Sequence, residues 1–232
     1  MKTNLDNIQI AYEDNHLIVI NKRPGDIVQG DKTGDTPLSD IVKAYIKIKY
    51  RKPGNVFLGV VHRIDRPTSG LVMFARTSKA LTRLNNALKN KEIQKTYWAI
   101  VKQKPNPDTG TLVHYLKKNP KKNKTTVFES PTNDAKKAVL HYKTLASSER
   151  YHLLEIDLET GRPHQIRAQL AKIGSPIKGD LKYGYPRSNP NGGISLHARK
   201  IDLIHPVKKE ALSIIAEPPE DDIWGFLVAN IK

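Results

Sequence analysis

One acidic residue stands among cations in the segment HRIDRPTSG, residues 62–70. Asp65 lies between Arg63 and Arg66, and His62 opens the segment. A carboxylate flanked by cations stays ionised, and an ionised carboxylate in a fixed turn can act as a nucleophile. A lone Asp beside arginines is more often part of a surface ion pair. The segment therefore suggests a nucleophile that the rest of the sequence has to support.

A second group of hydrogen-bonding side chains lies at the expected start of a helix, within residues 158–184. A turn at Arg162 leads into that helix, and free backbone amides beside a cation form a natural site for a phosphate. Arg167, one turn further, is suited to a paired hydrogen bond with a carboxylate from another segment. With His164 and Gln165 between them, these groups favour a ligand site over a merely solvated helix face.

The overall charge of the chain indicates a polyanionic partner. Its 232 residues include 39 Lys and Arg against 23 Asp and Glu, which gives a formal net charge of +16 and a pI near 9.8. Such a charge draws in nucleic acid, because cations that neutralise phosphates release condensed counterions. A membrane surface fits less well, since no helix with a basic face and a bulky apolar face is evident.

Several classes of chemistry are disfavoured by the residues that are missing. The chain has no cysteine, which removes disulfides, thiolate nucleophiles and cysteine-built metal sites. Its eight His residues form no paired spacing such as HExxH, so we expect no metal. The first residues lack a signal-peptide pattern and no apolar run reaches membrane-spanning length, which predicts a cytoplasmic protein without a membrane partner.

The apolar pattern predicts the elements that position these groups in the first part of the chain. Buried strands are expected at residues 17–20 and, directly after HRIDRPTSG, at residues 71–75. Two helices are expected beside them, one from Pro37 to about Ile46 behind a Thr36 cap and one capped by Ser78.

Further along, the pattern predicts strands around one helix. Alternation at residues 95–101 and 152–158 is typical of sheet strands. The basic segment 117–124 contains a Pro and two Asn, and we expect it to be a loop that joins two strands. Pro163 is well placed as the first residue of a helix that Gly174 ends.

Strands outnumber helices in this pattern, and the helices are scattered among the strands. We therefore expect an α+β fold, with a mixed, mainly antiparallel sheet flanked by a few helices. No repeat and no linker-like tract divides the chain. Residues 1–232 are therefore expected to form a single domain.

At these residues the sequence resembles the RluA-type pseudouridine synthases, which isomerise uridine within RNA. HRID followed by TSG is similar to the family's signature, usually HRLD with TSG after two variable positions, and Ile64 replaces the Leu. Further similar stretches follow in the family's order along most of the chain: YEDNHLIVINKRPG (12–25), KTYWAIV (95–101), TGRPHQIRAQL (160–170), GSPIKGDLKYG (174–184), then LHA and HP near the C-terminus. Several long matches in one order are highly specific.

The resemblance implies roles for individual residues. Asp65 would be the nucleophile, Tyr97 would stack on the target base and help to move the proton at carbon 5, and Arg167 would pair with Asp65. Arg63 would enter the RNA and take the place of the flipped base. The other expected substrate-binding residues are His62, Thr68, Lys95, Arg162, His164 and Gln165. Without the match, Tyr97 would be interpreted as an ordinary core aromatic.

The resemblance also implies a cofactor-independent enzyme that acts on ribosomal or transfer RNA, and we expect a monomer. The family pattern begins almost at the first residue, so we expect no separate N-terminal RNA-binding domain. The candidates for contacts with the RNA backbone are residues 117–124, Arg162, Lys178 and Lys182.

Other functions fit the residues less well. A hydrolase using Asp65 or Ser69 with His62 would be expected to show a GxSxG elbow, which is absent. A catalytically silent RNA-binding module of the same fold is the alternative from another class, and it would not need Asp65, Tyr97 and Arg167 together. The sequence leaves open which RNA and uridine are modified, and whether attack occurs at the sugar or at the ring.

Overall fold

A computed structural model describes residues 2–231, and its secondary structure is the α+β arrangement expected from the sequence. The contacts divide the chain into two compact units, one of residues 1–95 and 198–218 and the other of residues 96–197 and 219–232. We describe each unit by itself. That the whole chain acts as a single catalytic domain stays a prediction.

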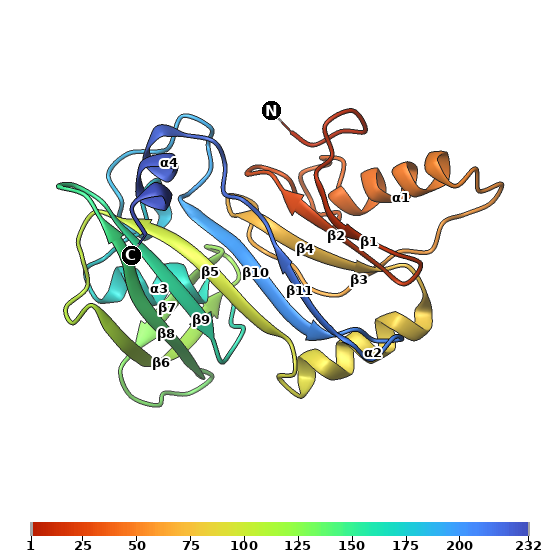
Figure 1. The fold of residues 1–232 in the computed structure, drawn as a ribbon. Coiled ribbons are helices and arrows are strands. Elements are labelled where there is room, and N and C mark those ends of the chain that lie inside the picture. Colours follow the sequence, from red (N-terminus) through yellow and green to blue (C-terminus); the bar gives the residue numbers. More distant parts are fainter. Residues whose placement is uncertain (1, 232) are drawn as a thin grey trace. The chain divides into compact units, whose positions relative to one another are not determined.

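The first unit is built on strands from both ends of the chain (Figure 1). Its strand order is β1 (Ile10–Glu13), β2 (Leu17–Lys22), β4 (Ser69–Ala75) and the part of β10 (Leu196–Ile204) that begins at Ala198; β3 (Gly59–Val60) pairs with β4, and β11 (Ala211–Ile215) with β10. The pairs β1–β2, β2–β4, β3–β4 and β10–β11 are antiparallel. The expected strands at residues 17–20 and 71–75 are confirmed.

Helices cover both faces of the first unit's sheet. Leu17, Leu71 and Met73 pack on one face with Leu84 of α2 (Ser78–Lys89). The residues of opposite parity, among them Ile18 and Phe74, pack with α1 (Leu38–Lys49). Both alternating sets of β2 and β4 are therefore buried, as the continuous apolar runs predicted.

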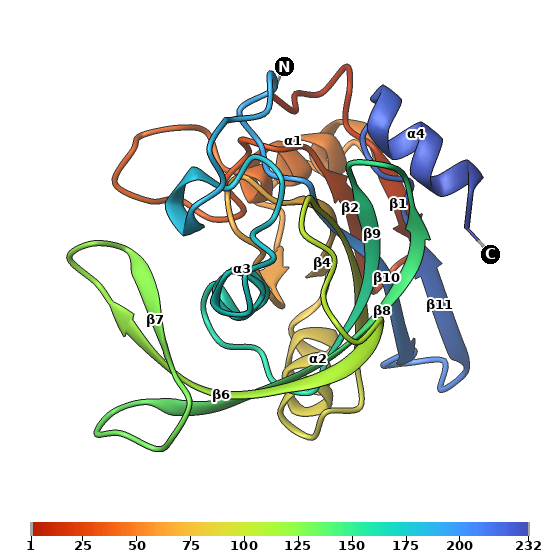
Figure 2. The ribbon, with the colours of Figure 1, turned by 90° about the vertical axis from the view of Figure 1, so that its left-hand side faces the viewer.

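The second unit holds the remaining strands. Their order is β5 (Gln94–Val101), β9 (His152–Leu158), β8 (Lys136–Ser147), β6 (Thr109–Asn119) and β7 (Lys124–Phe128), all paired antiparallel. Figure 2 shows α3 (Gln165–Lys172) inside the curve that these strands form. The helix α4 (Asp222–Ala229) packs through Trp224 and Leu227 on Trp98 and Leu153.

Two expected helix caps are wrong by one residue. The N-cap of α1 is Pro37, which is extended at φ −75° and ψ 151°, so the helix begins at Leu38 and Thr36 does not cap it. The N-cap of α2 is Thr77, whose hydroxyl accepts the N–H of Ala80 at 3.2 Å, and Ser78 is the first helical residue. At α2 the adjacent hydroxyl residues Thr77 and Ser78 make the choice ambiguous in sequence.

Two boundaries in the second unit also differ from expectation. The helix α3 begins at Gln165 and not at Pro163, because His164 adopts a left-handed conformation at φ 54°. Residues 117–119 belong to β6 and Lys124 to β7, so the loop of this basic hairpin is only residues 120–123. Since β7 is the edge strand of the sheet, lysines are tolerated there. Among residues 2–231, no helix is long and apolar enough to cross a membrane.

Candidate active site

Asp65 lies in a tight turn that ends where the buried strand β4 begins. The carbonyl of Asp65 accepts the N–H of Thr68 at 3.0 Å. Gly70 then takes a φ of +107°, and a Cβ at this position would lie 2.4 Å from the carbonyl oxygen of Ala198. Only glycine fits such a close approach. The glycine of TSG therefore has a structural reason: it lets β4 pass close to the backbone of Ala198.

The buried side chain of Lys22 bonds to the backbone of this turn. Lys22 is 1% exposed, and its ammonium donates to the carbonyls of Arg23 (2.9 Å), Asp26 (3.0 Å) and Arg66 (3.1 Å). The Arg66 carbonyl also accepts the N–H of Gly25 at 2.8 Å. Burial lowers the pKa of Lys22 to about 7, although Asp26 and Asp65 act in the opposite direction. The residue that follows Asp65 is thus fixed through its backbone.

His62 is a neutral acceptor in this unit. Its Nε2 accepts the N–H of Met73 at 3.2 Å, which requires an unprotonated nitrogen at that position. Burial, with a smaller effect of Lys95, lowers the pKa of His62 to about 3. Burial also lowers the pKa of Lys95. His62 therefore joins the loop to β4 and is not available as a cationic acid near neutral pH.

The other predicted residues of this segment differ in exposure. Arg63 is exposed, as a residue that enters RNA would need to be. Arg66 pairs with Asp35 at 2.5 Å, so its side chain serves a surface ion pair. Thr68 is buried at 2% exposure, and no hydrogen bond to its hydroxyl is found within residues 2–231. Direct contact of Thr68 with a substrate stays a prediction.

In the second unit, Arg167 is held by a buried carboxylate. Its Nε donates to Asp180 Oδ2 at 2.7 Å and its Nη2 to Asp180 Oδ1 at 2.9 Å, and the two side chains are 5% and 1% exposed. This paired geometry uses two of the five donors of the guanidinium and fixes its plane. The implied pairing of Arg167 with Asp65 stays a prediction.

Tyr183 connects Arg167 to the basic hairpin β6–β7. Its hydroxyl accepts the N–H of Thr125 at 2.8 Å and lies 2.9 Å from His164 Nδ1. The guanidinium of Arg167 lies 5.1 Å from the centre of its ring, and the ammonium of Lys124 5.4 Å from it. Burial raises the pKa of Tyr183 despite the Thr125 hydrogen bond, so the phenol stays protonated.

Strand register places Tyr97 on the same side of the sheet as α3. Tyr97 pairs with Ile156, and Ile156 with Tyr142, so these side chains share one face. Ala138 has the same parity on β8 and packs with Ala168 of α3. Tyr97 is 7% exposed. Its place on a rigid central strand suits the platform role that the family resemblance implies.

The start of α3 is closed by Gln165. Its Oε1 accepts from Thr160 (2.8 Å) and from the N–H of Arg162 (3.0 Å), and its Nε2 donates to the carbonyl of Val139 (3.0 Å). Arg162 is half-buried, with Nε donating to the carbonyl of Lys137 at 3.0 Å. These bonds show that Gln165 holds the turn before α3 in place, and that the half-buried Arg162 is tied to the same turn. Their binding to a substrate is untested.

Three residues of the candidate site were not assigned a role from sequence. They are Lys22, Asp180 and Tyr183, and all lie inside stretches that resemble the family. A buried lysine and a buried aspartate are rarely retained without a partner. The sequence pattern does not reveal their hydrogen-bond partners, because these lie far along the chain. Lys22 bonds to a carbonyl 44 residues away and Tyr183 to an amide 58 residues away. In residues 2–231 no three His, Asp or Glu side chains are grouped as metal ligands.

Comparison with known proteins supports the resemblance. A family model described as RNA pseudouridylate synthase matches residues 16–172. The "Uncharacterized RNA pseudouridine synthase YlyB" of Bacillus subtilis is 35% identical over 97% of this chain and 73% of its own length. The "Ribosomal large subunit pseudouridine synthase D" of Xylella fastidiosa is 33% identical over 92% of this chain and 67% of its own length. The "tRNA pseudouridine synthase C" of Pectobacterium carotovorum is 31% identical over 90% of this chain and 58% of its own length.

Solved structures show the same fold. "Human RNA Pseudouridylate Synthase Domain Containing 4" matches with a TM-score of 0.78 at 23% identity, covering 94% of this chain and 91% of the human one. "Human RNA Pseudouridylate Synthase Domain Containing 1" matches with a TM-score of 0.73 at 20% identity, covering 94% and 86%. The expected fold and family are confirmed, and the chain belongs to the RNA pseudouridylate synthases, which are isomerases.

Proposed function

We propose that this chain converts uridines of structured ribosomal or transfer RNA into pseudouridine, with Asp65 as the nucleophile. The observation that carries the proposal is the way in which the Asp65 turn is held. Lys22 and Gly25 both bond to the carbonyl of Arg66, so the residue next to Asp65 is fixed before any substrate arrives. A carboxylate in a preset position reacts without the entropic cost of ordering the loop.

The proposed reaction needs only a carboxylate and a pocket for the base. Asp65 attacks the nucleoside at the sugar or at the ring, and the bond between C1′ and N1 breaks. Uracil turns, its C5 bonds to C1′, and the bond that Asp65 had formed breaks, which restores the free carboxylate. The hydrogen at C5 then leaves and N1 gains a proton, so product and substrate have the same atoms. Tyr97 stacks on the base while it turns, and Arg167 keeps Asp65 ionised.

The target uridine has to leave its stack, which costs a few kcal/mol. Arg63 fills the vacated place, and phosphate contacts from the basic hairpin β6–β7, Arg162, Lys178 and Lys182 offset the cost. The formal charge of +16 favours such contacts. The names of the relatives include a ribosomal and a transfer RNA enzyme, which supports both substrate classes. We place the enzyme in the cytoplasm as a monomer.

The test uses RNA from cells that lack this protein, labelled with tritium at C5 of uridine. The wild-type chain should release tritium, and Asp65→Ala should release none while binding the RNA with unchanged affinity. Asp40→Ala removes an exposed carboxylate of the same unit and serves as the control. Tritium release by Asp65→Ala would reject Asp65 as the nucleophile. Binding without release by the wild-type chain would favour the silent RNA-binding module.

A further inference from the structure

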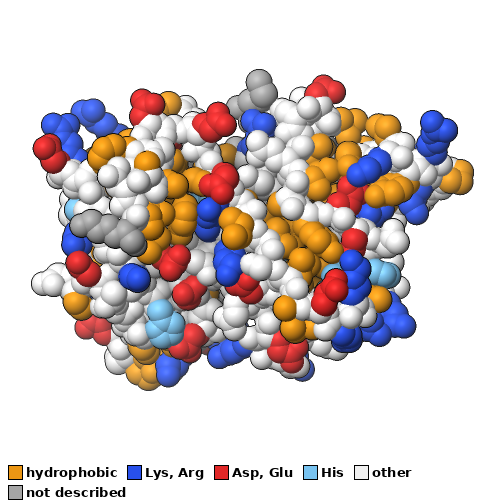
Figure 3. Space-filling model, in the orientation of Figure 1, with side chains coloured by type: hydrophobic (Ala, Val, Ile, Leu, Met, Phe, Trp, Pro, Cys, Tyr) orange, Lys and Arg blue, Asp and Glu red, His pale blue; other side chains and the backbone are white. Residues whose placement is uncertain are grey.

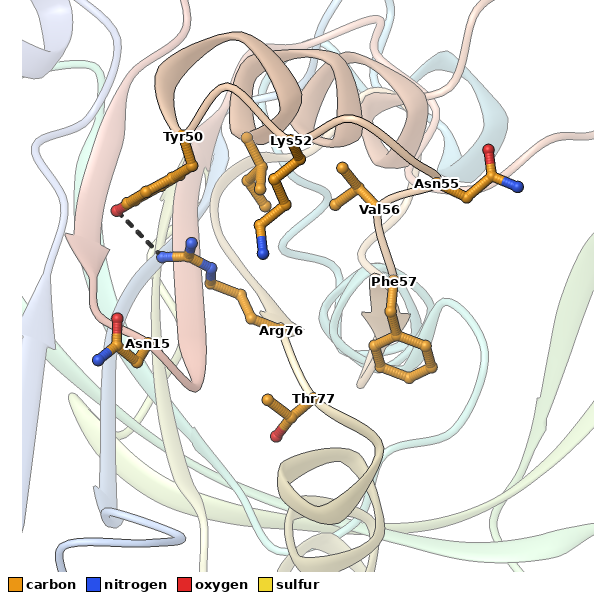
Figure 4. A pocket seen from close by; sticks show the side chains of 9 residues that line it. Asn15, Tyr50, Lys52, Asn55, Val56, Phe57, Arg76 and Thr77 are labelled. Atoms are coloured by element: carbon orange, nitrogen blue, oxygen red, sulfur yellow. Dashed lines mark hydrogen bonds between the residues drawn. The ribbon is translucent and has the colours of Figure 1, made fainter.

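A pocket of about 610 Å³ lies in the first unit, at the end of β4 opposite to the Asp65 turn. Two cations and two aromatic rings shape it. Figure 4 shows Lys52 and Arg76 extending toward each other across the pocket, with Tyr50 and Phe57 on opposite sides.

Arg76 is held rigidly in this pocket. Its side chain is 7% exposed, and its Nη1 donates to Glu13 (3.2 Å), to the carbonyl of Asp14 (2.5 Å) and to the hydroxyl of Tyr50 (3.3 Å). The guanidinium also lies 4.5 Å from the centre of the Tyr50 ring. The orientation of this cation is therefore fixed before any ligand binds.

The surroundings of Arg76 carry excess positive charge. Residues 47–52, KIKYRK, contain four cations and no acid. Glu13 faces both Lys49 (2.6 Å) and Arg76 (3.2 Å), so one carboxylate serves two cations. Within residues 2–231, no carboxylate lies at ion-pairing distance from the ammonium of Lys52. An anion between Lys52 and Arg76 would complete the charge balance.

The aromatic rings indicate which kind of anion fits. Phe57 is 48% exposed and Tyr50 42% exposed, so both rings are accessible to a ligand in the pocket. Figure 3 shows hydrophobic and cationic side chains side by side over the C-terminal end of α1 and the segment after it. An aromatic ring next to a fixed cation is the combination that binds a base and its phosphate.

We propose that this pocket binds a nucleotide of the RNA substrate other than the target uridine, with its phosphate between Lys52 and Arg76 and its base on Phe57. The proposal rests on the proposed function. The seven residues of β4 span roughly 23 Å at about 3.3 Å per residue. The bound nucleotide is therefore too far from the Asp65 turn to be the target uridine itself. The pocket increases the affinity for the RNA and helps to position it, and it does not affect the rate of the chemical step.

Binding is tested with a fluorescein-labelled ten-nucleotide oligouridylate in anisotropy titrations. Lys52→Ala and Phe57→Ala should each weaken binding by about tenfold, the order expected for one stacked or phosphate-bound nucleotide. The control Lys89→Ala removes an exposed cation at the far end of α2 and should change the affinity less than twofold. Thermal unfolding should be unchanged in all three, because their side chains lie at the surface.

Place and ligand class are tested separately. The same oligonucleotide carrying 5-iodouridine should crosslink under light to the peptide that contains Phe57, and Phe57→Ala should remove this crosslink. Uridine monophosphate should compete, whereas inorganic phosphate alone should compete at least tenfold more weakly. Equal competition by phosphate, with no effect of Phe57→Ala, would reduce the pocket to an anion site. Unchanged oligonucleotide binding in both variants would overturn the proposal and leave the pocket to a protein partner.

Kinetics keep this proposal separate from the proposed function. With the tritiated RNA, Lys52→Ala and Phe57→Ala should raise KM about tenfold and leave kcat unchanged. Asp65→Ala should abolish turnover and leave the Phe57 crosslink intact. If the oligonucleotide does not crosslink to the peptide that contains Phe57 while the wild-type chain shows normal turnover, the pocket proposal alone is rejected. Turnover by Asp65→Ala with an intact crosslink would reject the proposed nucleophile alone.

Discussion

The two segments that carry the candidate catalytic groups are held in opposite ways. The Asp65 turn is fixed through its backbone, because the buried ammonium of Lys22 bonds to three carbonyls around it. Arg167 is fixed through its side chain, because the buried carboxylate of Asp180 binds it at two atoms. In the first case a cation organises the loop beside an acid. In the second case a carboxylate orients a guanidinium.

The difference fits the roles that we propose for the two residues. A nucleophilic carboxylate has to keep its own oxygens available for reaction, so its position is best set by the main chain around it. A guanidinium has five donors and can spend two on a fixed partner. We therefore expect the two arrangements to fail in different ways when their buried partner is removed.

The largest effect is expected at Asp180. Asp180→Ala removes the carboxylate beside a buried guanidinium and should cost about 3–5 kcal/mol of unfolding free energy, measured in urea. Arg167→Met combined with Asp180→Leu removes both charges and should recover most of this loss. Turnover should stay lost in the double variant. Recovery of turnover together with stability would show that Arg167 has only a structural task.

A smaller effect is expected at Lys22. Lys22→Met keeps most of the length of the side chain but removes the three hydrogen bonds to carbonyls, which loosens the Asp65 turn. kcat should fall on the order of 10- to 100-fold, as for small misplacements of reacting groups, while RNA affinity stays the same. Lys89→Met is the matched control on the surface. An unchanged kcat would contradict the view that this turn is set through its backbone.

The smallest effect concerns the pH dependence of stability at His62. Its pKa is lowered by burial to about 3 in the folded chain, from 6.5 when unperturbed. Between these values the unfolded chain binds a proton that the folded chain does not. The contribution of neutral His62 to the free energy of unfolding is therefore present above pH 6.5. It is lost as the pH falls toward 3, by at most about 1.4 kcal/mol per pH unit.

His62→Gln should make the acid side of the stability curve shallower, because Gln can accept the N–H of Met73 without taking up a proton. Urea unfolding between pH 4 and 7 measures the slope. Asn86→Gln, at an exposed position on α2, changes no titratable group and should leave the slope as it is. Parallel curves for the wild type and His62→Gln would mean that His62 is more solvated than its contacts indicate.

Much of the local structure could be predicted from the sequence. The apolar runs at residues 17–20 and 71–75 are strands buried on both faces, and residues 152–158 are a strand with the expected bounds. These features depend on periodicity and on turns, which neighbouring residues encode. The caps at Thr36 and Ser78 and the helix start at Pro163 were wrong, because single residues decide them and a left-handed His164 has no sequence signal.

The sequence by itself determined the family and the residues proposed for chemistry, since HRIDRPTSG and the later stretches keep the family's order. Only the tertiary structure decided which groups hold them. Lys22 beneath Arg66 and Tyr183 against Thr125 are contacts between distant segments. The strength of these bonds comes from burial and exact geometry, and both arise only when sheets and helices have packed.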